Sequence, residues 1–204
     1  MRVGKRAISK TVFALFGFGG LALLIGCAST PKTHFYTLYV APEEATPAPA
    51  DAPVLVIEPL SAEPLASDLR LVYRTSPYTV DFYAYHQWAV DPAEQVTHTL
   101  AEALRASGAF SQVYVAPAPV AGDLRLRGKL HELCEVDEKD RWYGQVTLDL
   151  TLLRSQSGEV IWHKRFSQRI PAASRTPEAV VEALSEGVGE AASQIVREIS
   201  GANP

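Results

Sequence analysis

The chain has 204 residues, of which 47% are hydrophobic and 21% are charged, the balance of a globular protein. This length suits one ordinary domain, because single cores usually split beyond roughly 250 to 300 residues. The composition therefore argues against wholesale disorder and against a polytopic membrane protein.

Charge is distributed unevenly along the chain. The first 26 residues hold four basic side chains and no acidic one. The remaining residues carry 15 basic and 23 acidic side chains, a formal charge of −8. Nucleic acid and bare anionic lipid both select clustered Lys and Arg, so an acidic body argues against either as the main partner.

The N-terminus has the design of an export signal, with a basic start, an apolar run from Thr11 to Ile25 and a small-residue end. A run of about 15 apolar residues is shorter than the roughly 20 that span a bilayer as a helix. Its last four residues, Leu24-Ile25-Gly26-Cys27, resemble the lipobox of bacterial lipoproteins. The alternatives are an uncleaved anchor, whose helix the glycines of this run would weaken, or an ordinary signal with an incidental cysteine.

The lipobox resemblance implies that residues 1–26 are removed and that Cys27 receives a diacylglycerol and an N-acyl chain. The next residue is Ala28 rather than Asp, which in lipoproteins generally favours transfer to the outer membrane. The resemblance therefore implies a place on the periplasmic face of that membrane, in a Gram-negative type of bacterium. The cysteine left over is Cys134, so no internal disulfide is expected in the mature chain. Cys134 falls in an alternating strand pattern, where cysteine usually behaves as a small buried hydrophobe.

The mature chain begins with a β-rich segment at 33–40, expected to join the sheet, and continues into an Ala/Pro-rich linker that ends at Pro53. Val54–Ile57 is apolar without alternation, which predicts a central strand covered on both faces. Strands over 69–75 and 79–88 are separated by Ser76-Pro77-Tyr78, a hairpin spacing. We therefore divide the chain into a signal (1–26), a lipid-anchored strand and linker (27–53) and an α+β domain (54–204).

Asp91-Pro92-Ala93-Glu94 predicts a helix start, with an Asp N-cap, proline at the first helical position and Glu94 to accept from free amides. The apolar stripe of this helix runs to about Ser107, and Gly108 supplies the left-handed residue that ends it. A second amphipathic helix opens at Thr176. Between the helices the sequence predicts strands over 110–115, 123–135, 145–153 and 160–170.

Two amphipathic helices and six to eight strands, several of them polar at alternate positions, predict an α+β fold. We expect a two-layer sandwich in which a mixed β-sheet carries both main helices on one face. Such a fold has no closed, lipid-sized interior, which argues against a lipid carrier.

No common catalytic signature is present: the sequence has no nucleophile elbow, P-loop, dinucleotide-binding loop or zinc-protease motif. The five histidines are scattered, and none has a second histidine at a spacing that would converge on a metal. His131 and Cys134 point to opposite faces of their strand. We expect no enzyme activity, no metal and no cofactor other than the acyl chains on Cys27.

The segment 69–88 is rich in Tyr, Trp and Arg, the residues enriched at protein interfaces. In an extended strand, Tyr83 and Tyr85 would face one way and Trp88 the other. In one alternative, one face of this strand packs in the core and the other is an ordinary protein surface. In the second alternative, the aromatic residues form an interface with a partner. The candidate interface residues are Arg74, Tyr83, Tyr85 and Trp88.

Taken in order behind the lipobox, several segments resemble the ABC-type transport auxiliary lipoproteins, the family that includes the PqiC-type component. The resemblance covers essentially the whole mature chain and rests on an order of weak motifs. Its residues are Phe35-Tyr36-Thr37-Leu38, Leu71-Val72-Tyr73-Arg74, Phe82 through Ala89, Thr99 through Leu104, Asp123 through Leu126 and the terminal helix. The sequence departs from the family pattern at Ala89 to Pro92 and in the long linker.

The resemblance implies a docking lipoprotein that works with a periplasmic MCE-domain protein and with an inner-membrane permease and ATPase that move lipid between membranes. It also implies a homo-oligomeric ring, acylation at Cys27, and structural or interface roles for Arg74 and Trp88. A different class of function is an assembly or pilot lipoprotein for another cell-envelope complex. The absence of a Ser, Asp and His constellation disfavours a third, hydrolytic or lipid-binding class.

Overall fold

The computed structural model describes residues 31–41 and 44–201. The chain divides into two compact units, residues 1–32 and 33–204, and the description that follows concerns the second. The predicted signal at 1–26 and the predicted acylation site Cys27 lie outside the described residues. The elements are β1 (His34–Tyr36), β2 (Val54–Ile57), β3 (Ser61–Ala62), β4 (Arg70–Ser76), β5 (Thr79–Trp88), α1 (Pro92–Ala106), β6 (Gln112–Val115), β7 (Leu124–Glu138), β8 (Arg141–Arg154), β9 (Val160–Pro171) and α2 (Pro177–Gly201).

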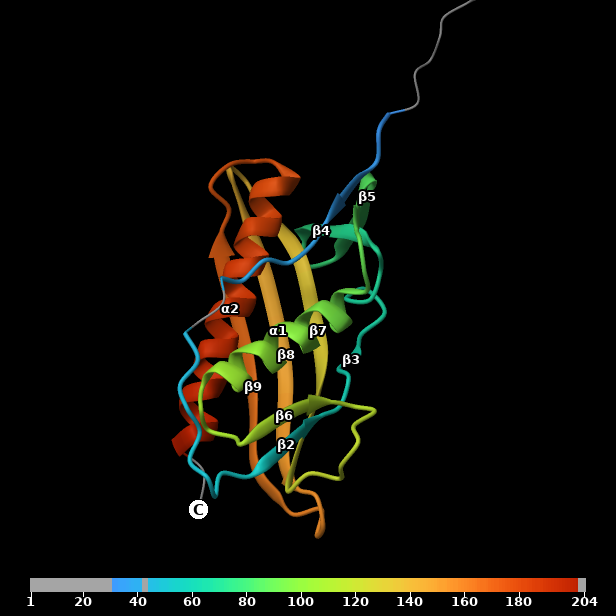
Figure 1. The fold of residues 1–204 in the computed structure, drawn as a ribbon. Helices are drawn as coiled ribbons and strands as arrows, with labels where there is room; N and C mark the ends of the chain where they lie inside the picture. The colour runs from blue at the N-terminus through green and yellow to red at the C-terminus, as the bar shows by residue number, and fades with distance from the viewer. Residues whose placement is uncertain (1–30, 42–43, 202–204) are drawn as a thin grey trace, which may run out of the picture. The chain divides into compact units, whose positions relative to one another are not determined.

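Strand β7 organises a mixed sheet of nine strands. Along one edge it pairs antiparallel with β8, which pairs antiparallel with β9. Its other edge is shared by three short parallel strands, β2, β3 and β4, at successive positions. Strand β6 extends the sheet from β2, and β5 then β1 extend it from β4, so these two groups lie at opposite ends of β7 (Figure 1).

The long strands β7 and β8 follow the predicted alternation. Leu126 and Leu130 in β7 are fully buried, as are Leu148 and Leu150 in β8. On the opposite face Lys129 of β7 forms an ion pair with Glu63 at 2.6 Å. One face of these strands therefore faces the core and the other faces solvent.

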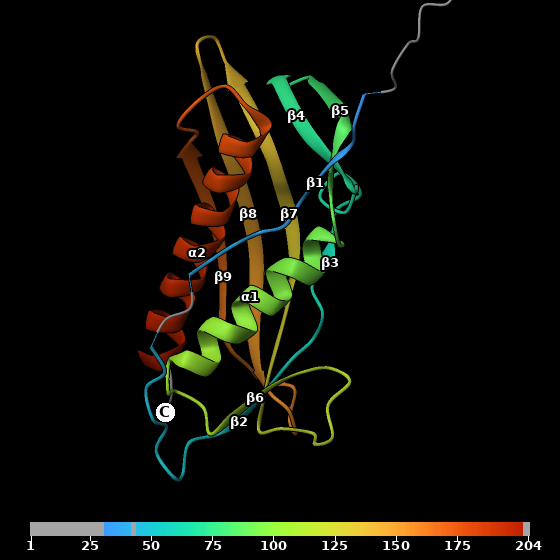
Figure 2. The same cartoon turned by 45° about the horizontal axis from the view of Figure 1, so that its top comes forward.

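Both helices cover the same face of the sheet, and α1 crosses obliquely beside α2 (Figures 1 and 2). The buried leucines and valines of the sheet and the apolar stripes of both helices form one core cluster. The fold is an α+β sandwich with an open mixed sheet and helices on one face, which confirms the predicted class. Within the described ranges, no helix is both long and apolar enough to cross a membrane.

The start of α1 is capped as predicted. The carboxylate of Asp91 accepts from the amides of Ala93 at 2.8 Å and Glu94 at 3.2 Å. The helix ends at Ala106, and Gly108 takes φ +69°, the left-handed conformation that glycine adopts without strain. The cap, the proline and the glycine thus fix both ends of this helix locally.

Helix α2 lies against the backbone of β8 at Gly144. A Cβ at this position would lie 2.7 Å from the backbone nitrogen of Leu184 in α2. Gly187 of α2 lies against Val146 with more room: its Cβ would be 3.2 Å from a Val146 methyl. The tighter contact is therefore made by a strand glycine.

The N-terminal strand is shorter than predicted. Strand β1 covers His34–Tyr36 and pairs parallel with the end of β5, whereas a strand was expected over 33–40. Beyond it, the amide of Leu38 donates to Gln95 Oε1 at 2.8 Å, and that of Tyr39 donates to Ser185 Oγ at 3.2 Å. These helix side chains satisfy backbone groups that a strand partner would otherwise satisfy, so the segment leaves the sheet for the helix layer.

The predicted central position of β2 is confirmed, because it lies between β6 and β7 and its residues Leu55 to Ile57 are buried. Strand β3 was not predicted. It has two residues, too few to produce a recognisable pattern, and it exists only through its pairing with Lys129 and Leu130 of β7.

Candidate functional site

The hairpin β4–β5 carries most of the aromatic residues that the sequence singled out, and its second strand contains a large bulge. Val72 pairs with Phe82, but Arg70 pairs with Gln87. Between these pairs β4 contributes Leu71 alone, while β5 contributes the four residues 83–86. The first half of β5 thus pairs with β4, and its last residues also pair with β1.

This bulge corrects the expected alternation of β5. A regular strand would send Tyr83 and His86 to opposite faces, but their rings lie 5.4 Å apart in an edge-on arrangement. Tyr83 also contacts Tyr73 of β4, with ring centroids 5.0 Å apart. The extra residues rotate the chain between the two positions, so side chains from both predicted faces gather in one cluster.

A buried carboxyl group lies at the base of this cluster. Tyr83 donates a hydrogen bond of 2.9 Å from its hydroxyl to Oε2 of Glu135 in β7. Glu135 is only 2% exposed, and its second oxygen, Oε1, has no hydrogen-bond partner among the described residues. Burial, and after it the nearby charge of Asp137, raise the pKa of Glu135 to about 7. Burial likewise raises the pKa of Tyr83, so its phenol stays protonated.

The cluster continues to β1 through a histidine pair. The hydroxyl of Tyr36 lies 2.8 Å from Nδ1 of His86, and the His86 ring stacks on that of His34 at 5.2 Å. Burial, together with the charge of His34, lowers the pKa of His86. The contacts join β1, β5, β4 and β7 across the end of the sheet.

The four candidate interface residues separate into different environments. Trp88 is 3% exposed and belongs to the core cluster, so this residue lies in the core and not at an interface. Tyr83 is half-buried in the cluster described above. Arg74 forms an ion pair of 2.8 Å with Glu132, whose other oxygen accepts from Thr147 at 2.7 Å. Tyr85, at 41% exposure, keeps a ring available to a partner.

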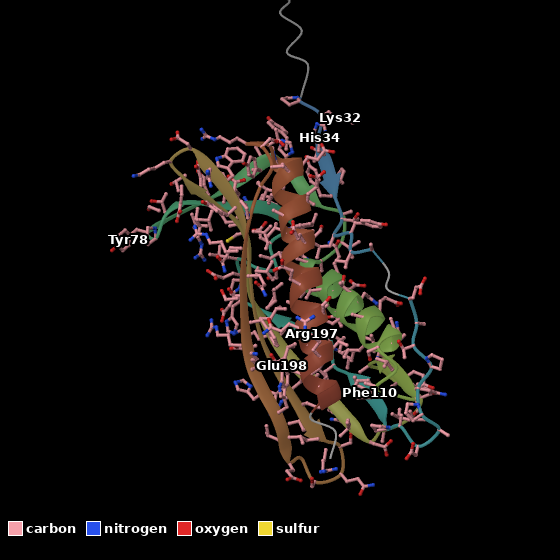
Figure 3. The ribbon with its side chains drawn as sticks, turned by 90° about the vertical axis from the view of Figure 1, so that its left-hand side faces the viewer. Lys32, His34, Tyr78, Phe110, Arg197 and Glu198 are labelled. Carbon is pink, nitrogen blue, oxygen red and sulfur yellow. The ribbon has the colours of Figure 1, made fainter. Side chains whose placement is uncertain are left out.

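The most exposed aromatic residue of the hairpin was not among these candidates. Tyr78, in the turn between β4 and β5, is 97% exposed and points away from the body of the domain (Figure 3). Phe35 in β1 is also well exposed. The proline before Tyr78 indicates a turn in the sequence. Because side chains at the tip of a turn are usually exposed, this signal could have identified Tyr78.

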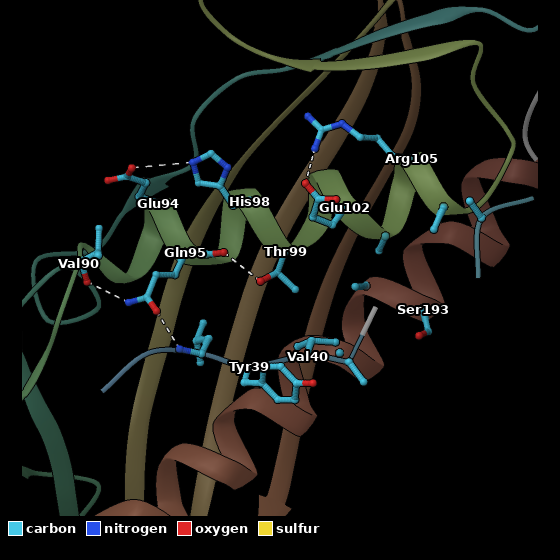
Figure 4. A pocket seen from close by; sticks show the side chains of 17 residues that line it. Tyr39, Val40, Val90, Glu94, Gln95, His98, Thr99, Glu102, Arg105 and Ser193 are labelled. Atoms are coloured by element: carbon cyan, nitrogen blue, oxygen red, sulfur yellow. Dashed lines mark hydrogen bonds and ion pairs between the residues drawn. The ribbon is translucent and has the colours of Figure 1, made fainter. Parts of the chain in front are cut away.

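A groove lies between α1, α2 and the segment after β1, with a volume of about 600 Å³ (Figure 4). Gln95 holds its wall in place, because its amide donates to the carbonyl of Val90 at 2.9 Å and its oxygen accepts from Leu38. The polar rim carries Glu94, His98 and Glu102. The lining elsewhere is mainly apolar and includes Leu38, Val40, Val90, Ala103, Ala106 and Ala192.

Sequence reasoning missed this groove because its walls come from three segments far apart in the chain. The volume falls within the range of small-molecule sites. The groove is partly open to solvent, and so differs from the closed interior of a lipid carrier.

In the part of the chain that the structure describes, no group of three or more His, Cys, Asp or Glu side chains is placed to hold a metal ion. Cys134 is buried, as predicted, and burial raises its pKa to about 11, which keeps the thiol protonated. On the solvent-facing side of the sheet, Nε2 of His131 forms a hydrogen bond of 2.7 Å with Oδ2 of Asp149.

Solved structures with the same fold confirm the architecture. A DUF330 family protein from Xanthomonas campestris superposes with a TM-score of 0.69 at 20% identity, covering 82% of this chain and 96% of that one. An uncharacterised protein superposes with a TM-score of 0.64 at 17% identity, covering 83% and 99%. At these identities the similarity shows the fold alone. No curated protein matches the sequence.

The family model for the ABC-type transport auxiliary lipoprotein component matches residues 36–196, from β1 nearly to the end of α2. The match includes the bulged hairpin, both helices and all three long strands. The chain therefore belongs to the ABC-type transport auxiliary lipoprotein component family.

Proposed function

We propose that this protein is a non-enzymatic outer-membrane lipoprotein subunit of an ABC/MCE-type intermembrane lipid-transport complex. Acyl chains on Cys27 would anchor it, and the folded domain would dock the periplasmic MCE-domain component, supporting envelope integrity. The observation that carries the proposal is the family match over residues 36–196, because the family is an auxiliary component of ABC-type transport.

The surface of the domain supports a docking role. The solvent-facing side of the long strands carries several ion pairs, such as Arg74 with Glu132 and Arg169 with Glu138. Exposed ion pairs of this kind contribute little stability but set complementarity toward a charged partner. Tyr85 adds an exposed aromatic side chain, the type of residue that anchors protein interfaces.

The sheet also offers a route to the proposed homo-oligomeric ring. In the described part of the chain β9 pairs with β8 on one edge, and no strand pairs with its other edge. Its residues Lys164 and Arg169 are held by ion pairs to Glu198 and Glu138. A second copy approaching this edge would meet backbone groups that are ready to pair.

A pull-down of the tagged lipoprotein from detergent-solubilised envelopes, followed by mass spectrometry, tests this function. Recovery of an MCE-domain protein, with or without its permease and ATPase, is the expected result. Recovery of a secretin, a pilus component or peptidoglycan machinery without any MCE-domain protein would replace it with the assembly-lipoprotein alternative. Globomycin-type inhibition of lipoprotein processing, and the Cys27→Ala variant, would separately test the anchor.

A further inference from the structure

The end of the domain that carries the start of β1 also carries exposed aromatic side chains. His34 lies at this end in Figure 3, Tyr78 lies in the same half, and Phe110 lies in the other. We define the aromatic end by its exposed apolar residues, which belong to β1, to β5 and to the turn before β5: Phe35, Tyr78, Val80 and Tyr85.

Tyr78 is presented on a structured turn. Its amide donates to Ser76 Oγ at 3.2 Å, and Ser76 Oγ donates to Thr79 Oγ1 at 3.0 Å. These bonds close the hairpin and leave the Tyr78 side chain projecting into solvent at 97% exposure. An ordered turn lowers the entropy that would be lost when the ring is immobilised by a partner.

The length of chain before the domain limits how far this end can lie from a membrane. His34, the first residue of β1, is seven residues after Cys27, and such a stretch spans at most about 25 Å however it is arranged. Strand β7, with 15 residues, is about 45 Å long, and its far end at Leu124 lies beside β2. An acylated Cys27 therefore keeps the aromatic end close to the lipid surface and leaves the β2–β6 end free to point away.

We propose that the aromatic end rests on the lipid surface, with the ring of Tyr78 among the headgroups. This inference depends on the acylation of Cys27 that the proposed function contains. Tyrosine suits the position because its ring is apolar and its hydroxyl stays in contact with water, which is why it is enriched at membrane interfaces.

The attraction is aromatic and apolar in nature. At the neighbouring tip between β7 and β8, Lys139 and Arg141 alternate with Glu138 and Asp140, so the tip presents no surplus of positive charge. Residues 27–204 are acidic as a whole. Electrostatic attachment to anionic lipid needs clustered basic residues, so contact at the aromatic end should not depend on salt.

The test places a fluorophore on either end of the intact, acylated lipoprotein reconstituted into phosphatidylethanolamine/phosphatidylglycerol vesicles. Thr75→Cys labels the exposed side of β4 next to the hairpin turn, outside the bonds that hold this turn, and Ser157→Cys labels the β8–β9 turn near the other end. Cys134 does not compete for the label, because it is buried with a protonated thiol. A lipid with a nitroxide on its headgroup should quench the Thr75→Cys label at least about threefold more than the Ser157→Cys label.

Two matched tyrosine variants identify the contact. In the Thr75→Cys background, Tyr78→Ser should reduce the quenching, while Tyr39→Ser should leave it unchanged. Tyr39 is also well exposed, at 75%, but lies by the groove between the helices. Quenching should persist from about 0.1 M to about 1 M salt, a range over which electrostatic screening shortens to a few ångström.

The outcomes separate this inference from the function on which it rests. If the protein floats with the vesicles but both labels are quenched equally weakly, the anchor stands and the surface assignment is wrong. If it does not float, the anchor and the surface assignment fall together. Strong quenching at Thr75→Cys in a protein that recovers no MCE-domain partner would keep the membrane contact and overturn the transport role.

Discussion

Tyr83 and Glu135 join the bulged hairpin to the longest strand of the sheet through one hydrogen bond of 2.9 Å. The pairing of β4 with β7 covers only Tyr73 with Glu135 and Arg74 with Val136. A buried side-chain bond beside so short a ladder therefore contributes to holding the hairpin in place. Because the acceptor is a carboxyl group with a pKa of about 7, this attachment depends on pH.

The Glu135→Gln variant should be more stable than the wild type at pH 8. Glu135 has a folded-state pKa of about 7, raised from an ordinary value near 4.5, so between these values the folded state binds more protons than the unfolded state. The wild type therefore loses up to about 3 kcal/mol of stability as pH rises through this window. Glutamine carries no charge and keeps an acceptor for Tyr83. Urea unfolding at pH 5 and pH 8 should show a gain only at pH 8; an equal effect at both would refute the assignment.

The Tyr83→Phe variant should be destabilised by about 1 to 3 kcal/mol, with the larger loss at pH 8. Removal of the hydroxyl leaves both oxygens of Glu135 without a partner among the described residues, which costs most when the carboxyl is ionised. Tyr85→Phe is the control, because it removes a hydroxyl from an exposed ring. Equal losses in the two variants, measured by urea unfolding, would show that the buried bond contributes nothing.

Trp88→Ala and Tyr85→Ala should separate core from surface within β5. Trp88→Ala should lower the free energy of unfolding by about 3 to 5 kcal/mol, as expected for a large aromatic side chain removed from a core. Tyr85→Ala should change it by less than about 0.5 kcal/mol. Tyr85→Ala should instead reduce the amount of partner protein that is recovered by pull-down. Thermal unfolding checks the first pair of values, and unchanged recovery would remove Tyr85 from the interface.

Gly144→Ala should destabilise the domain by about 1 to 3 kcal/mol through overpacking. Its new Cβ would lie 2.7 Å from the Leu184 nitrogen, a backbone atom that can move only with the helix. Gly187→Ala is the matched control, since its Cβ would meet the side chains of Val146 and Ile170 at 3.2 Å and 3.4 Å. Alanine also favours the helix there by up to about 1 kcal/mol. A denaturation midpoint lower for Gly187→Ala than for Gly144→Ala would contradict the assigned contact.

The sequence by itself determined the elements whose signals are local. Asp91, Pro92 and Gly108 define the ends of α1 through a side-chain cap, a fixed backbone angle and a left-handed residue. The alternation of leucine and charged residues defines the faces of β7 and β8, because side chains on a strand point to opposite sides in turn. These features, with the order of weak motifs, were enough for the fold class and the family.

Only the tertiary structure decided which residues meet. The bulge at residues 83–86 interrupts the pairing of β5 with β4, and β1 joins the other edge of β5 directly after it. A period-two pattern carries no information about such an interruption. The bulge moves Tyr83 toward Glu135 and leaves Trp88 in the core. The groove and the aromatic end likewise combine segments that are distant in the chain. Alternation and capping report each residue's nearest neighbours, whereas sites depend on packing between elements, which the folded domain alone specifies.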